Sequence, residues 1–295
     1  MKDITSSVYN FEDLIQGNFL YVDKTEYIWQ LIKPAKEMYF LSRPRRFGKS
    51  LTVSTLKAVF EGKKELFKGL AIYDKPYDWK PYPVIHFDFA NCDIKSADEL
   101  IRYLNDQLSD IANLFNLQLR GDLLSVRFEN LINDIAINGD VVILVDEYDK
   151  PILNNILSEN VNEILSVLKG FYSNIKKLGS KLRFVFLTGV SKFCHVSLFS
   201  DLNNLTDITM DARYATMFGY TQEELEANFA DKISAISNGH DIDAFKAKIK
   251  EWYNGFRFEE NAKTVYNPVS LAKFFENGGK FNNYWFSTGT PSFLM

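Results

Sequence analysis

Short apolar runs and segments with helical periodicity alternate along the first 210 residues. Apolar runs without polar alternation predict strands that are buried on both faces. The strands predicted in this way, the last of them an edge strand, span Met38 to Leu41, Pro83 to Phe89, Val141 to Val145, Leu182 to Leu187 and Leu205 to Met210. Helices are predicted over Lys24 to Lys33, Leu51 to Phe60, Leu100 to Phe115, Val126 to Ile137 and Val161 to Ile175. This alternation predicts an α/β fold in which helices flank a parallel sheet.

The pattern changes after Met210, where strands give way to helices. Thr221 and Glu224 have the spacing of a capping box, which marks the start of a helix. Two further helical patterns cover Ile242 to Tyr253 and Pro268 to Phe275. We therefore expect two parts, a sheet-containing core over residues 1–212 and a C-terminal helical lid over residues 213–295.

A basic loop that ends in Gly48, Lys49 and Ser50 follows the first predicted strand and precedes a helix. This order is the setting of a P-loop, in which backbone N–H groups and the helix dipole hold phosphates. Gly48 would let the backbone approach a phosphate, Lys49 would reach the β and γ phosphates, and the Ser50 hydroxyl would bind Mg²⁺. The nucleotide-binding residues predicted in this segment are Arg43, Pro44, Arg45, Arg46, Phe47, Gly48, Lys49, Ser50 and Leu51.

The loop departs from the usual P-loop pattern, because Arg43 occupies the position of the first glycine. Taken alone, the segment could be a surface turn with Ser50 as the N-cap of the next helix. Arg45 and Arg46 could contact phosphates, which guanidinium groups bind in a bidentate manner, or be solvated loop charges. A second motif downstream favours nucleotide binding.

The second motif is an acidic pair, Asp146 and Glu147, directly after the strand predicted over Val141 to Val145. Ligands of open α/β sheets bind at the carboxyl ends of the strands, so these side chains are expected near the P-loop. Asp146 is expected to hold Mg²⁺ together with Ser50, and Glu147 to polarise the attacking water. Alternatively the strand ends in a plain polar turn, and Asp149 either supports the site or begins a helix.

Thr188 follows another predicted strand and is the candidate sensor of the γ-phosphate or of the attacking water. Such a sensor belongs to P-loop ATPases in which an added strand lies between the P-loop strand and the acidic strand. Ser191 lies behind Thr188 in the sequence, and a plain Thr-Gly turn is the alternative. Glu147, Lys49 and Thr188 form the predicted catalytic set.

Composition argues against several classes of protein. A net charge of −4 gives no overall attraction to nucleic acid or to an anionic membrane. No apolar run approaches the ~18 residues that a membrane-spanning helix needs, and the N-terminus has no apolar signal region. Two distant cysteines and three unclustered histidines lack metal-ligand spacing, which is typical of a reducing compartment, so we expect a cytoplasmic protein. The sequence has no guanine-reading Asn-Lys-x-Asp motif, so ATP is expected rather than GTP.

Several blocks of the sequence resemble the bacterial AAA-ATPase-like family of predicted ATPases, which is related to archaeal and STAND P-loop ATPases. These blocks are Tyr21 to Thr25, Arg43 to Leu51, Val145 to Pro151, Leu187 to Lys192, Phe218 to Thr221, Trp252 to Phe256, Tyr266 to Pro268 and Trp285 to Ser292. The resemblance implies a P-loop sheet of the ASCE type with a helical lid, and ATP and Mg²⁺ as ligands. It also implies that Arg43 is a normal feature of this P-loop. Pro268 resembles a lid residue that touches adenine, although a helix can also simply start with proline.

The resemblance leaves three functions open. The first is Mg²⁺-dependent ATP hydrolysis as a slow switch, because neither Arg213 nor Arg257 can be chosen as an arginine finger. The second is a nucleotide-regulated interaction module that acts on a protein partner or by self-association. The third is the ATPase part of a nucleic-acid-processing system, because many family members resemble fusions with a PD-(D/E)XK nuclease-like domain. No such domain is expected within these 295 residues, and the aromatic end, residues 284–295, is expected to be covered by another surface.

Overall fold

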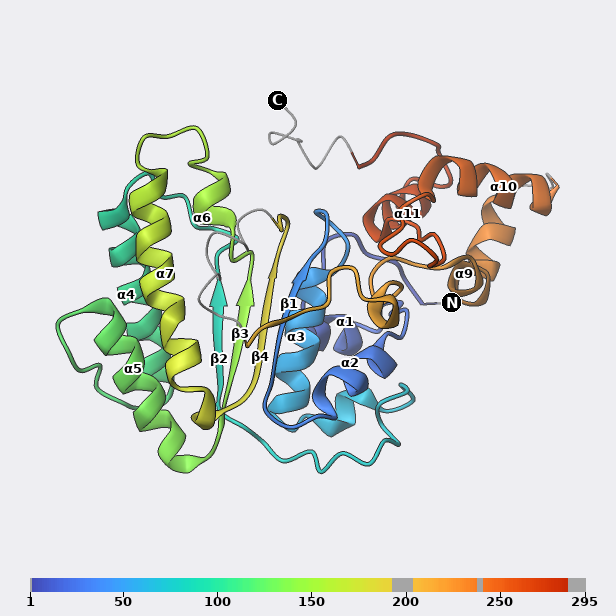
Figure 1. Ribbon diagram of the computed structural model, residues 1–295. Coiled ribbons are helices and arrows are strands. Elements are labelled where there is room, and N and C mark those ends of the chain that lie inside the picture. The colour runs from blue at the N-terminus through green and yellow to red at the C-terminus, as the bar shows by residue number, and fades with distance from the viewer. Residues whose placement is uncertain (1, 193–203, 238–240, 286–295) are drawn as a thin grey trace.

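The computed structural model describes residues 2–192, 204–237 and 241–285, and a five-stranded parallel sheet lies at its centre (Figure 1). The strands are β1 (Glu37–Ser42), β2 (Val84–Asp88), β3 (Val141–Asp146), β4 (Leu182–Gly189) and β5 (Thr206–Asp207). They lie in the order β2-β3-β4-β1-β5. Strand β4 therefore separates β1, which leads into the P-loop, from β3, which ends in the acidic pair. The predicted α/β class, the parallel sheet and the edge strand are confirmed.

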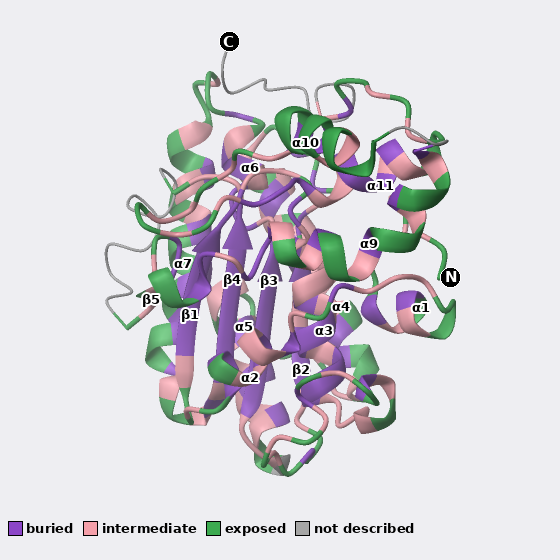
Figure 2. Cartoon of the chain, turned by 90° about the vertical axis from the view of Figure 1, so that its right-hand side faces the viewer, coloured by how far each residue is buried: buried purple, intermediate pink, exposed green. Residues whose placement is uncertain are grey.

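The central strands are buried on both faces, as their continuous apolar runs predict. Alternate side chains of β3 and β4 enter two separate cores. The core on the α3 side includes Val142, Leu144, Phe184 and Phe186. The core on the other side includes Ile143, Val145, Val185 and Leu187. Figure 2 shows these strands buried along most of their length. Because each such side chain contributes about 1.5–3 kcal/mol on burial, the strand ends that carry the candidate site are firmly fixed.

Three long helices cover one face of the sheet, namely α4 (Ala97–Leu114), α5 (Leu124–Ile135) and α7 (Val161–Lys177). Helix α4 packs through an apolar stripe that includes Leu100 and Leu104. The spacing of Ser96 and Glu99 predicts a full capping box at its start, but this box is half formed. The Ser96 hydroxyl accepts from the Glu99 N–H, whereas the Glu99 carboxylate accepts from the N–H of Lys95, one residue earlier than expected.

The opposite face of the sheet carries α3 (Lys49–Phe60), with α1 (Phe11–Gln16) and α2 (Thr25–Ile32) beside it. Two helices are short: α1 was not predicted from the sequence, and α6 (Lys150–Leu153) corresponds to the helix start that was one alternative for Asp149. Neither is long enough to show helical periodicity. Local caps define α1, in which the side chain of Asn10 accepts from the N–H of Asp13. Both short helices border the candidate site.

The lid, defined as residues 213–285, lies beside the α2 side of the sheet (Figure 1). Its helices are α9 (Gln222–Ile236), α10 (Ile242–Tyr253) and α11 (Pro268–Glu276). The capping box predicted for α9 is confirmed, because Thr221 and Glu224 each bond the backbone of the other. The three helices share an apolar core that includes Phe229, Tyr253 and Phe274.

The lid also contains extended pairing that helical patterns did not predict. Isolated antiparallel bridges join Tyr220 to Tyr266 and Phe256 to Val265. The aromatic C-terminal end that was expected to be covered lies mostly outside the described residues. Within the described part of the chain, no helix combines the length and the apolar character needed to cross a membrane.

Candidate nucleotide site

The P-loop lies between the end of β1 and the start of α3, at the carboxyl edge of the sheet. Helix α3 begins at Lys49 with Gly48 as its N-cap, so Ser50 is in the first turn and not at the cap position. Gly48 has a φ of 91° and Arg46 a φ of 69°, both in the left-handed region. A Cβ atom at residue 48 would meet nothing within 4 Å, so the backbone angle, and not space, favours glycine. The anion-binding end of α3 thereby faces a pocket.

The Lys49 side chain is buried inside the curve of the P-loop. Its ammonium donates to the carbonyl oxygens of Arg43 and Pro44, both at 3.1 Å. Burial lowers the pKa of Lys49, and the negative charge of Asp146 opposes that shift. In the absence of a ligand the loop therefore holds its lysine with its own carbonyl groups. Phosphate oxygens are stronger partners for an ammonium group than neutral carbonyls are.

Ser50 and Asp146 meet at the end of β3, where a metal site was predicted. The side chain of Ser50 hydrogen-bonds the Asp146 carboxyl group, which is almost fully buried. Burial raises the pKa of Asp146 to about 6. A hydroxyl and a carboxylate are suitable oxygen ligands for Mg²⁺, which usually takes its other ligands from phosphates and water. The described residues contain no cluster of three or more His, Cys, Asp or Glu side chains that could hold a metal by themselves.

Replacing Asp146 by Asn is expected to stabilise the nucleotide-free protein at pH 7. A carboxyl group whose pKa is raised on folding destabilises the folded state once it ionises, and this cost grows as the pH rises from about 4 to about 6. A pKa raised from 3.8 to about 6 corresponds to about 3 kcal/mol at pH 7, an upper value for the gain. Urea unfolding of both proteins at pH 7 and pH 4 tests this, because the difference should nearly vanish at pH 4.

Glu147 lies in an unusual backbone conformation directly after Asp146. Its φ is 51°, in the left-handed region that is uncommon for residues other than glycine. The N–H of Glu147 donates to Asp146 Oδ1 at 2.9 Å, which ties the two acids together. Its carboxylate lies 3.4 Å from the ammonium of Lys150, and both side chains line the pocket. Backbone strain of this kind is common at functional sites, and here it occurs at a carboxylate that lines the same pocket as the P-loop.

A pocket of about 520 Å³ runs from the P-loop to the lid. The predicted residues that line it are Arg45, Arg46, Phe47, Gly48, Lys49, Ser50, Leu51, Glu147 and Pro268. Four other predicted residues do not line it, namely Arg43, Pro44, Asp146 and Thr188. The pocket also involves segments that the sequence analysis missed, among them residues 4–9 near the N-terminus and Asp88 and Asn91 after β2.

Asp88 could have been found from the sequence. It ends the apolar run of β2 in the same way that Asp146 ends β3, and the two residues are partners in the parallel register. Its carboxylate accepts from the N–H of Ala90 and is exposed to the pocket. Asp88 and Glu147 therefore form an acidic side of the pocket, which the basic P-loop also lines.

Arg43 points away from the pocket, although it was predicted to bind nucleotide. Its guanidinium donates to the carbonyl oxygens of Ser42 and Thr209 and stacks over the ring of Phe258 at 4.1 Å. Burial lowers the pKa of this guanidinium to about 10. The segment just after β5 supplies a carbonyl partner, and the lid supplies an aromatic one. Arg43, which replaces the first glycine of the P-loop pattern, therefore anchors the loop to these two segments.

Thr188 is fully buried, on the same face of β4 as Phe184 and Phe186. Its hydroxyl has no hydrogen-bond partner among the described residues. Its carbonyl accepts from the N–H of Tyr148, which joins the end of β4 to the acidic motif. The sensor role of Thr188 therefore stays a prediction.

The two candidate arginine fingers lie outside the pocket. Arg213 forms hydrogen bonds with Asp211 through two of its nitrogens, and Arg257 donates to the carbonyl of Glu260. Neither side chain lines the pocket.

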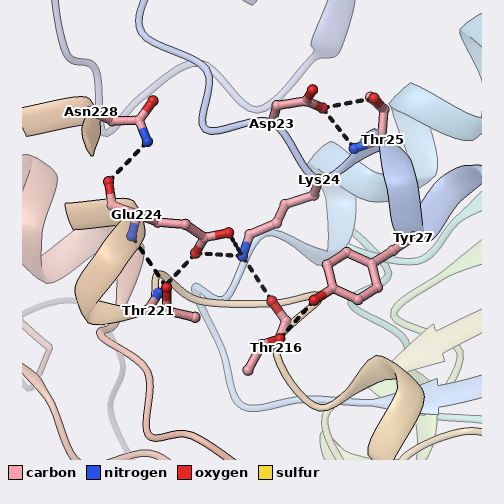
Figure 3. A network of polar contacts seen from close by, with 8 residues as sticks. All are labelled: Asp23, Lys24, Thr25, Tyr27, Thr216, Thr221, Glu224 and Asn228. Carbon is pink, nitrogen blue, oxygen red and sulfur yellow. Dashed lines mark hydrogen bonds and ion pairs between the residues drawn. The ribbon is translucent and has the colours of Figure 1, made fainter. Parts of the chain in front are cut away.

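The block Tyr21 to Thr25 connects the core to the lid (Figure 3). The ammonium of Lys24 lies 2.6 Å from the Glu224 carboxylate at the start of α9 and also donates to the carbonyl of Thr216. Asp23 accepts from the backbone and the hydroxyl of Thr25 at the start of α2. Because Lys24 also lines the pocket, this network lies between the pocket and the first lid helix.

Comparison with known proteins agrees with this geometry. The family described as "Predicted AAA-ATPase" matches residues 6–199. The whole chain is also 40% identical, over 299 aligned residues, to the "Uncharacterized protein in vnfD 5'region" of Azotobacter chroococcum mcd 1. The match covers 55% of that relative, so the chain spans about half of its length. The family match covers about two thirds of the chain, and the P-loop and the acidic strand end agree with it. The chain therefore belongs to the AAA-ATPase-like family of predicted AAA-ATPases.

Proposed function

We propose that this chain binds Mg²⁺ and ATP in the pocket between the P-loop and the lid, and hydrolyses the ATP. One observation carries the proposal. Lys49 and Ser50 from the start of α3 line a pocket together with Glu147, and Asp146 at the end of β3 hydrogen-bonds the side chain of Ser50. These four residue types in this arrangement match the needs of phosphoryl transfer, which are positioning and charge neutralisation.

Each of these residues has a role that its position allows. Lys49 exchanges its two carbonyl partners for oxygens of the β and γ phosphates. Ser50 and Asp146 hold Mg²⁺, which, when bound, neutralises charge on the transferred phosphoryl group. Glu147 accepts a hydrogen bond from water and orients it towards the γ-phosphate. Asp146 must lose its proton to bind the metal, so acidification below about pH 6 opposes metal binding.

The other end of the pocket suits a planar base. Apolar side chains from the N-terminal segment and the lid line it, namely Ile4, Val8, Leu20, Val22, Phe229, Pro268 and Ala272. A volume of about 520 Å³ lies within the range of small-molecule sites. This end includes Pro268, so the predicted adenine contact is geometrically allowed. We assign the base as adenine, because the chain has no guanine-reading motif.

Turnover is proposed to be slow, as in a switch. Neither Arg213 nor Arg257 lines the pocket, so neither can contact a phosphate without a rearrangement. Lys24 lines the pocket and pairs with Glu224 on the lid. A bound nucleotide can therefore change the position of the lid through this ion pair. A rate of many turnovers per second by the isolated chain would contradict the switch.

Changing Lys49 to Ala is expected to weaken Mg²⁺–ATP binding. The loss of a charge-assisted contact to phosphate should raise the dissociation constant ~10-fold or more. Calorimetric titration of both proteins measures this directly. Lys57→Ala is the matched control, because Lys57 is on the same helix and outside the pocket. If the folded wild-type chain binds no ATP, the proposal fails.

A further inference from the structure

The basic side chains around the pocket come from three places. They are Lys24, Arg45, Arg46, Lys49 and Lys150. Lys24 lies towards the lid, and the next three belong to the P-loop. Among the described residues that line the pocket, Lys150 is the one basic residue on the acidic side, next to Glu147. It begins α6, immediately after the acidic motif of β3.

Lys150 is held next to Glu147 by the turn between β3 and α6. The N–H of Lys150 donates to the carbonyl of Glu147 at 2.9 Å, and its ammonium lies 3.4 Å from the Glu147 carboxylate. About a quarter of each side chain is exposed. Ion pairs with this exposure contribute little stability, so the partners can separate when a stronger one arrives.

The backbone under Lys150 is fixed, whereas its side chain is partly exposed and pairs with Glu147 at 3.4 Å. The next two residues, Pro151 and Ile152, are buried, and the side chain of Asn155 donates to the carbonyl of Pro151. The flexible four-carbon stem of lysine therefore moves its ammonium without moving α6. A change of partner by Lys150 needs no rearrangement of the fold.

We propose that Lys150 leaves Glu147 and contacts the terminal phosphate when ATP occupies the site. This inference rests on the proposed function, because it assigns a contact within that same pocket. Lys150 reaches the phosphate from the start of α6, separately from the P-loop, and supplies the charge that Arg213 and Arg257 are not placed to give. Its departure frees the Glu147 carboxylate to orient water. Glu147 is thereby released by ATP, which has a γ-phosphate, and not by ADP, which lacks one.

Changing Lys150 to Gln separates this contact from a merely structural role. Binding of the non-hydrolysable β,γ-imido analogue of ATP should weaken about tenfold, whereas ADP binding should change less than about twofold. Turnover of ATP should fall about 10- to 100-fold. Lys150→Arg keeps the charge and should restore most of the preference for the analogue. Lys177→Gln is the matched control, because Lys177 forms a surface ion pair with Glu129 outside the pocket.

A second measurement uses the ion pair itself. Glu147→Gln removes the competing partner of Lys150, so the imido analogue should bind about threefold more tightly. Adding Lys150→Gln should remove that gain, which a double-mutant cycle detects. Equal effects of Lys150→Gln on the analogue and on ADP, or no effect on either, overturn the inference while leaving the proposed function intact. If the wild-type chain binds neither nucleotide, the proposed function and the inference both fail.

Discussion

Glu147→Gln is expected to reduce ATP turnover about 1,000-fold while ATP binding is retained, since positioned general bases contribute about 10²–10⁴-fold. Glutamine has nearly the same shape, but a neutral amide orients and activates water poorly. The left-handed backbone at Glu147 is equally accessible to glutamine, so the fold should not change. Phosphate release under saturating ATP measures turnover, and calorimetry measures binding.

The control for this substitution is Glu163→Gln, which changes an acidic residue in the first turn of α7, outside the pocket. Full activity of Glu147→Gln would transfer the catalytic role to another carboxylate, and Asp88 is the candidate, because it lines the same acidic side of the pocket. A wild-type chain that binds ATP without measurable turnover would instead favour the nucleotide-regulated interaction module.

The sheet could be predicted from the sequence because its strands are buried on both faces. Val141 to Val145 is a run without polar residues, and such a run has few alternatives to a central parallel strand. The order of the strands needed more, and it followed from the type of P-loop protein that the motifs indicated. Helix α1 escaped prediction because a six-residue helix is defined by its caps and contacts, not by a period.

Some residues of the candidate site could be predicted, because their place next to strands or helix starts is enough to bring them to the site. Glu147 directly follows β3, and Lys49 and Ser50 begin the helix after the loop that follows β1, so the parallel sheet brings them to one edge. Contacts between distant segments had no signal of this kind. Arg43 was expected at the phosphates, but the carbonyl of Thr209, just after β5, and the ring of Phe258 are partners that only the folded chain brings near. For the same reason the ion pair of Lys24 with Glu224, 200 positions apart, could not be predicted.

The end of β4 is tied to the acidic motif by a second set of contacts, centred on Asp149. The buried Asp149 carboxylate accepts from the N–H groups of Val190 at 3.0 Å and Ser191 at 2.6 Å. Gly189 makes room for this arrangement, because a Cβ atom there would lie 2.5 Å from the Tyr148 ring and 2.6 Å from Asp149 Oδ1. Asp149 does precede a helix, as one of the two alternatives predicted, because it is the N-cap residue of α6, but its side chain makes no capping hydrogen bond. Its position instead supports both strand ends beside the P-loop.

Asp149→Ala is therefore expected to destabilise the nucleotide-free protein by up to about 3 kcal/mol, because two part-buried N–H groups lose their acceptor and a fully buried one would cost about 1–3 kcal/mol. Burial raises the pKa of Asp149, so relief of the buried charge offsets part of this loss. Urea unfolding measures the change, and faster hydrogen exchange at Val190 and Ser191 would locate it. Both N–H groups bond the same oxygen, Asp149 Oδ2, so Asp149→Asn, which keeps one acceptor oxygen, should lose much less. Equal stability of Asp149→Ala and the wild type would mean that burying the carboxylate costs as much as its two hydrogen bonds contribute.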